Sequence, residues 1–393
     1  MGRETIYDRA YFHYLPMLSN TDRGMKILDE LKNDPRTKSL EGVHTFTGRG
    51  FGSYSPENLA IWYLWASDKF SETEARLGLD SYLDSDKIPI LNTLWIVGVI
   101  VKEPIILSNE IRILPIQEIP DSEAKELYLE TDRKLLNYSY PMPKAAIVCE
   151  PVVERTVEYF EDPSPILERN KEYSESIKLL EDTCLLLNLI EGISSTPYCH
   201  ATYSMPKMPF GMFNGSSSST FRYDVIGYRA VELKNGRKSE INKLLKSFLE
   251  LEEEEKGRFR RILSRLSQAK RRDQIEDKIL DLSIALEMSL LDDNKKYDQL
   301  SLSFRLRGSW LIASNAIERD EVYNYLKKLY DYRSQVAHSG AFKKNTPENK
   351  RLIKQNLSNY CSIAERIICK LIHDGQPDWD LLILGSDKPR KSL

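Results

Sequence analysis

Two kinds of segment are missing from this sequence: an apolar stretch long enough to cross a membrane, and a set of paired cysteines. The longest apolar run, residues 94–101, has eight residues, far fewer than the ~20 that a spanning helix needs. The five cysteines are odd in number, form no C-x-x-C pair and follow no N-terminal secretion signal. We therefore expect a cytoplasmic protein with reduced thiols and no membrane anchor.

Motifs that would hold a metal or a cofactor are also missing. The sequence has only five histidines, no H-E-x-x-H motif and no cluster of cysteines and histidines. The glycine-rich stretch 47–53 lacks the G-K-[ST] ending of a phosphate-binding loop, and no G-x-S-x-G nucleophile turn occurs. We expect neither a metal nor a cofactor.

The sequence does contain enough apolar residues for more than one core. With 393 residues, 41% of them hydrophobic, it should form two or three compact units. Its charge is uneven: 29 basic and 24 acidic residues from position 240 onward give +5, whereas 27 basic and 35 acidic residues before it give −8. The basic part is the better candidate for binding an anionic partner.

Residues 1–239 are expected to form a mixed α+β domain. β-branched runs at 94–119 and 145–153 predict short strands, and residues 221–233 favour a further strand. Residues 176–193 have the length and apolar density of a buried helix. Residues 205–220 predict an irregular loop, because they combine two prolines, two glycines and four consecutive serines. The apolar residues of this loop either fold back on the domain or form a binding lip (Met208, Phe210, Met212, Phe213).

Residues 240–393 are expected to form an all-α domain. Helices are predicted at 240–256 and 257–272, and the second carries arginines for water or phosphate (Arg258, Arg261, Arg265, Arg271, Arg272). Residues 273–293 have two apolar stripes, which predicts a helix at the centre of a bundle. Further helices are expected at 297–313, 320–338 and 347–373, so an up-and-down bundle fits.

One pair of residues in this helical part suits a specific chemistry. Arg333 lies five positions before His338 in YDYRSQVAHSG, at the predicted end of a helix with Gly340 as its stop. Arginine binds phosphate oxygens, and histidine exchanges a proton near neutral pH. Together they suit attack of a ribose 2′-hydroxyl on its own phosphodiester, a reaction that needs no metal.

The spacing alone is not specific, since five histidines give about one chance match of this type. Arg366 and His373 form a second match inside an apolar helix, and we interpret that pair as accidental. Purely structural roles are the alternative. His338 would interact with the last helical carbonyls, and Arg333 would form an ion pair with Asp331 or Glu287.

Three features in order resemble the Apea-like branch of the HEPN superfamily. They are an acidic residue in LSIALEMSLL, then FRLRGSWLIA, then LKKLYDYRSQVAHSG, and together they span residues 258–375. The resemblance implies an all-α HEPN helical bundle that pairs with a second copy, as a homodimer or a higher homo-oligomer, and brings two R-x-x-x-x-H motifs together. It also implies metal-independent cleavage of RNA, as a toxin or an antiphage (abortive infection) effector.

The resemblance assigns roles to individual residues. His338 would be the acid and base, Arg333 the phosphate-binding group, Ser334 a supporting polar residue and Glu287 the acidic partner that orients Arg333. The RNA backbone would be held by basic residues near the motif (Arg305, Arg307, Lys343, Lys344).

Residues 1–239 would then sense a phage-derived or protein trigger or restrain the nuclease. Two alternatives remain open: a HEPN module that only dimerises or acts as a scaffold, and a helical RNA-binding protein that uses the basic segment 258–272.

Overall fold

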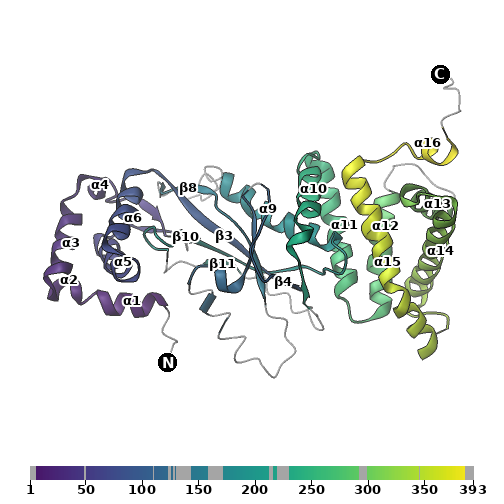
Figure 1. The fold of residues 1–393 in the computed structure, drawn as a ribbon, viewed down its shortest axis with the longest axis horizontal. Coiled ribbons are helices and arrows are strands. Elements are labelled where there is room, and N and C mark those ends of the chain that lie inside the picture. The colour runs from purple at the N-terminus through teal and green to yellow at the C-terminus, as the bar shows by residue number, and fades with distance from the viewer. Residues whose placement is uncertain are drawn as a thin grey trace, which may run out of the picture. The chain divides into compact units, whose positions relative to one another are not determined.

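A computed structural model describes residues 6–47, 50–108, 110–122, 125–126, 129, 143–157, 171–211, 216–218, 230–291, 299–344 and 346–385. Two compact units form (Figure 1): residues 1–181 with 197–222, and residues 182–196 with 223–393. The second unit therefore includes a short segment from the middle of the chain, in addition to the residues from 240 onward that the sequence indicates.

The first unit begins with helices that pack around an apolar core. Serine and threonine side chains cap three of them, because Thr21, Ser55 and Ser71 each accept a bond from a backbone N–H of the first turn. Helix α5 is buried on almost every side, from Leu59 to Ala66, as expected for a helix that others surround. These helices are α1 (Ile6–Tyr14), α2 (Met17–Asn20), α3 (Asp22–Asn33), α4 (Pro35–Lys38), α5 (Pro56–Lys69) and α6 (Glu72–Asp84).

Within the described residues, the largest sheet of this unit has seven strands in the order β11-β10-β3-β7-β6-β5, with β8 also pairing with β3. Its central strand β3 is buried on both faces for most of its length, and Trp95 and Leu91 help to form a second apolar core. Its strands are β3 (Lys87–Val97), β5 (Ile105–Ile106), β6 (Arg112–Pro115), β7 (Ala145–Cys149), β8 (Val152–Glu154), β10 (Thr196–Ser204) and β11 (Ser216–Ser218). A smaller sheet joins β1 (His44–Phe46), β2 (Phe51–Ser53) and β9 (Thr156–Val157), and β4 covers Val99–Ile100.

The prediction of a mixed N-terminal part is confirmed, with two local corrections. Residues 216–218, which were expected to be irregular, form strand β11 and pair antiparallel with β10, because backbone hydrogen bonds in a ladder outweigh the weak strand preference of serine. The expected helix at 176–193 begins earlier and ends sooner, as α9 (Lys171–Leu186) followed by a 3₁₀ turn at Leu187–Leu189.

The loop at 205–211 folds back on its own domain. Met208 is buried and Phe210 packs against the helical core, so for these two residues the interpretation as a domain-covering loop is confirmed. Met212 and Phe213 lie outside the described residues, as does most of the strand expected at 221–233.

The second unit is helical from residue 238 onward, which confirms the predicted class of this part. Figure 1 shows α15 lying alongside α12, and the two helices pack together. The other helices that α12 contacts are α11, α13 and α14, so its two apolar stripes are both covered, as expected. The helices are α10 (Lys238–Leu249), α11 (Glu253–Arg271), α12 (Ile275–Leu290), α13 (Leu300–Ile312), α14 (Ala316–Ser339), α15 (Pro347–Asp374) and α16 (Trp379–Leu384).

Gly308 explains how closely α13 approaches its neighbours. A Cβ atom at this position would lie 2.5 Å from Leu326 Cδ1 of α14 and 3.3 Å from Ile367 Cδ1 of α15. The missing side chain therefore lets three helices meet around one point.

Candidate active site

Helix α14 carries the Arg333–His338 motif and has a defined start and end. The Asn315 side chain accepts a bond from the Glu318 N–H, and the Glu318 carboxylate accepts one in return from the Ser314 N–H. At the other end Gly340 has φ 70° and its N–H bonds to the Val336 carbonyl, which is the left-handed stop that the sequence indicates. The motif thus occupies the last two turns of a capped helix.

Glu287 of α12 holds Arg333. Arg333 Nε lies 3.1 Å from Glu287 Oε1, and Arg333 Nη2 donates to Oε2 at 3.2 Å, so the pair is bidentate. The guanidinium also lies over the Tyr330 ring, 5.9 Å from its centre. Burial raises the pKa of Glu287, and the charge of Arg333 opposes that shift. Tyr330, one helical turn before Arg333, belongs to the quoted segment LKKLYDYRSQVAHSG, but the sequence assigned it no role.

His338 is exposed and lies on a different side of α14 from Arg333. Five residues along an α-helix correspond to a rotation of about 140°, so the two side chains leave the helix in different directions. Ser334, four residues before His338, is only about 40° away from it and is partly buried. One copy of the chain therefore places Ser334 beside His338 but does not bring Arg333 and His338 together.

The turn after α14 returns to the helix end that carries His338. The Ser339 hydroxyl donates to the Gln335 carbonyl at 2.7 Å, and the Lys343 N–H donates to the Gln335 side-chain oxygen at 2.9 Å. Phe342 is buried against Tyr332, with 5.6 Å between ring centres. This turn leaves the side chains of Lys343 and Lys344 exposed next to the motif.

The two arginines expected to bind RNA from α13 have different surroundings. Arg307 is 6% exposed, donates to the Leu290 carbonyl at 2.7 Å and stacks on Trp379. Its guanidinium is thus part of the core and is not exposed to an RNA backbone, which corrects the expectation for this residue. Arg305 is partly exposed and lies over Tyr323, which precedes Arg333 by about 15 Å along α14.

Among the described residues, three of the six arginines of the basic segment form ion pairs with acidic residues of the same unit. Arg265 and Arg272 both contact Asp281, whose side chain is 6% exposed. Arg260 forms a bidentate pair with Asp182, at 2.8 and 2.9 Å. Arg271 is buried, and Arg258 is partly buried beside Phe259. These contacts leave Arg261 as the exposed arginine of α11 and weaken the hypothesis of an RNA-binding surface there.

The second arginine–histidine match, Arg366 and His373, lies on one face of α15. Seven residues correspond to nearly two full turns, and both side chains line the same open groove. Arg366 bonds to Glu318 and to the Ile312 carbonyl, while His373 Nδ1 lies 2.8 Å from the Ser247 hydroxyl.

Comparison with profiles of known protein families, with curated proteins and with solved structures gives no match. Over the part of the chain that the structure describes, no group of three or more His, Cys, Asp or Glu side chains is placed to hold a metal ion. No helix of that part is long and apolar enough to cross a bilayer.

Proposed function

We propose that the second unit is a HEPN-type endoribonuclease of the Apea-like branch that cleaves RNA without a metal. One observation supports it most. Glu287 fixes Arg333 on one side of α14, while His338 remains exposed on the other side at the end of the same helix. The turn that the Lys343 N–H closes onto Gln335 also places two exposed lysines, Lys343 and Lys344, near the helix end that carries this histidine.

In the proposed reaction, His338 takes the proton from a ribose 2′-hydroxyl. The 2′-oxygen then forms a bond to the adjacent phosphorus, and the bond from phosphorus to the 5′-oxygen breaks. A protonated histidine returns the proton to that leaving oxygen, so the products are a 2′,3′-cyclic phosphate and a free 5′-hydroxyl. Arg333 bonds to Glu287 through Nε and Nη2. Its third nitrogen, Nη1, would stabilise the negative charge on the phosphorane.

The active form is proposed to be a homodimer with the site between two copies. A rotation of about 140° separates Arg333 from His338 on one helix, so a second copy is needed to place an arginine opposite a histidine. Arg305, Lys343 and Lys344 are proposed to bind the RNA backbone, each as a solvent-exposed or partly exposed cation near α14.

The full chain with His338→Ala tests this proposal. Cleavage of RNA in EDTA should fall by at least about 100-fold, as expected when a general acid and base is lost. His13→Ala is the matched control, because His13 is an exposed histidine of α1 in the other unit. If the His338→Ala chain cleaves RNA as fast as the His13→Ala chain, the catalytic assignment is wrong, and a non-catalytic module explains the fold better.

We also propose that the first unit senses a trigger or restrains the nuclease, as an antiphage effector requires. A truncated chain should then arrest growth more strongly than the full chain. The truncated chain should keep residues 182–196 together with 223–393, joined by a short flexible linker in place of 197–222, because Asp182, Asn188 and Ile193 bond to α11 of the second unit. Equal or weaker growth arrest by a folded truncated chain would contradict restraint.

A further inference from the structure

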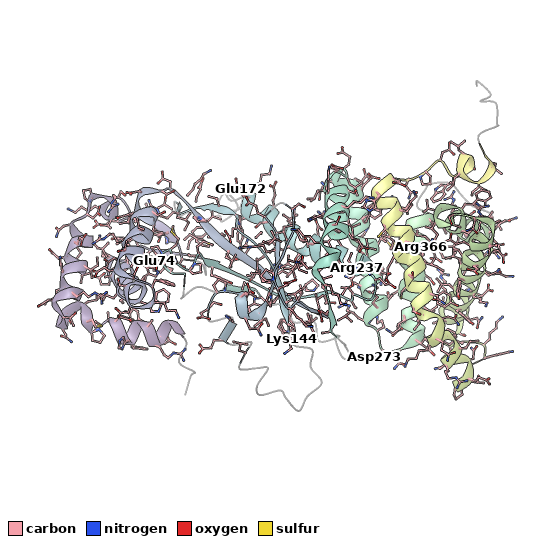
Figure 2. The ribbon with its side chains drawn as sticks, viewed as in Figure 1. Glu74, Lys144, Glu172, Arg237, Asp273 and Arg366 are labelled. Carbon is pink, nitrogen blue, oxygen red and sulfur yellow. The ribbon has the colours of Figure 1, made fainter. Side chains whose placement is uncertain are left out.

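An open groove of about 490 Å³ lies in the helical unit, away from Arg333 and His338 in sequence and on other elements. Its lining comes from the C-terminal end of α13 with the turn that follows, and from the last turns of α15. Figure 2 labels Arg366, which belongs to this part of α15. The lining residues are Leu311, Ile312, Ala313, Ser314, Arg366, Cys369, Lys370 and His373.

The groove has one cationic side and one apolar side. Arg366, Lys370 and His373 follow each other at intervals of four and three residues, so they form one row along α15 with neighbours about 5–6 Å apart. Leu311, Ala313 and Cys369 provide the apolar part. Burial raises the pKa of the Cys369 thiol to about 12, so this residue acts as a small apolar group and not as a nucleophile.

Hydrogen-bond donors remain available in this row. Among the described residues, Arg366 makes both of its bonds through Nη2, to the Glu318 carboxylate at 2.5 Å and to the Ile312 carbonyl at 2.9 Å. Its Nε and Nη1 hydrogens are left for another acceptor. Lys370 contacts Asp374 and has two further N–H bonds to offer.

His373 is held so that one ring nitrogen is available. Its Nδ1 lies 2.8 Å from the Ser247 hydroxyl of α10, which leaves Nε2 for a ligand. Partial burial, together with the positive charges of Lys243 and Lys370, lowers the pKa of this imidazole, while Asp374 opposes the shift. A neutral ring that accepts from Ser247 at Nδ1 carries its proton on Nε2 and can donate it.

We propose that this groove binds a phosphate monoester the size of a mononucleotide. The phosphate oxygens would accept bonds from the guanidinium, the ammonium and the imidazole, and the organic part would lie against the apolar wall. A phosphate dianion fits this row better than a carboxylate, because it carries more negative charge and offers more acceptor oxygens to the donors of the row. The volume is within the range of small-molecule sites, about 300–1,000 Å³. This binding does not depend on the proposed nuclease reaction.

Isothermal titration calorimetry of the full chain with 5′-AMP tests the proposal, with adenosine as the probe that lacks the phosphate. The variants are Arg366→Gln and Lys370→Gln, and Arg351→Gln is the matched control, an exposed cation at the other end of α15. Arg366→Gln also removes the ion pair with Glu318 of α14. Lys370→Gln provides an independent measurement, because Lys370 pairs only with Asp374 of the same exposed helix end among the ion pairs described.

AMP is expected to bind at least about tenfold more tightly than adenosine, and each groove variant should weaken AMP binding about tenfold, as the loss of one charge-assisted hydrogen bond does. Arg351→Gln should leave the affinity unchanged. The proposal is overturned if AMP does not bind, or if adenosine binds as well as AMP. It is also overturned if Lys370→Gln binds AMP as tightly as the Arg351→Gln control does. His338→Ala should not alter AMP binding, so failure here and failure of the nuclease proposal are separate results.

Discussion

Glu287 shows how a single residue can favour the site while opposing stability. The pKa of its carboxyl group in the folded chain is raised by burial, so between the ordinary and the raised pKa the unfolded state binds fewer protons than the folded one. The ionised side chain therefore disfavours folding at pH values above the raised pKa, and this cost is lost as the pH falls from the raised pKa to the ordinary one. What Glu287 contributes is a fixed orientation of the Arg333 guanidinium.

Glu287→Gln should accordingly separate stability from activity. We expect the variant to unfold at the same temperature as the unmodified chain or a higher one at neutral pH, with the difference lost as the pH falls to the ordinary pKa of glutamate. RNA cleavage should fall about 10- to 100-fold, because Arg333 loses its bidentate partner. Thermal unfolding over a pH series, combined with cleavage rates, measures both effects. A variant that is less stable at neutral pH and fully active would show that the pair is only structural.

Residue patterns predicted part of the candidate site but not all of it. The Gly340 stop could be expected from a local signal, a glycine after the last helical residue, whereas Glu287 was expected from the resemblance and as one of two candidate ion-pair partners of Arg333. The burial of Arg307 could not, because it depends on Trp379 and the Leu290 carbonyl, which come from other elements. Distant contacts of this kind leave no pattern in the neighbouring sequence.

At the scale of elements, one buried lysine joins three parts of the helical unit. Lys270 of α11 lies 2.7 Å from Glu365 of α15 and donates to the carbonyls of Asn188 and Ile193 at 2.6 and 2.7 Å. The side chains of Lys270 and Glu365 are 8% and 10% exposed, and burial raises the pKa of Glu365. The contact attaches the segment 182–196 to helices that follow it by many residues, which the sequence boundary at 240 did not anticipate.

Lys270→Met should lower the free energy of unfolding by about 3 kcal/mol, since it leaves a buried carboxyl group and two carbonyls without their partner. Lys270→Met combined with Glu365→Leu should recover part of this loss, because the unpaired acid is removed as well. Urea unfolding measures both variants, and Lys246→Met, whose side chain is 76% exposed, is the control and should change stability by less than about 0.5 kcal/mol. A single variant as stable as the control would contradict a role for this contact.

At the scale of the whole molecule, helix periodicity predicted the C-terminal class well, because each helix buries one or two continuous stripes. Strand pairing was less predictable. Strand β3 pairs with β7 and β10, which follow it by many residues, and β11 forms from serines that favour turns. Pairing of distant strands depends on the complete sheet and not on local preference.

The proposed composite site makes a prediction about the assembly that single variants cannot test. Arg333→Ala and His338→Ala chains should each be inactive alone, but an equal mixture should regain at least about tenfold activity, because a mixed dimer still contains one arginine and one histidine on opposite copies. The control mixes Arg333→Ala with the Arg333→Ala/His338→Ala double variant, which offers no arginine and should stay inactive. Differently tagged chains show by co-purification that mixed dimers form. If they form and no activity returns, Arg333 and His338 must act within one copy, and the rotation between them on α14 would have to be overcome by a change in that helix.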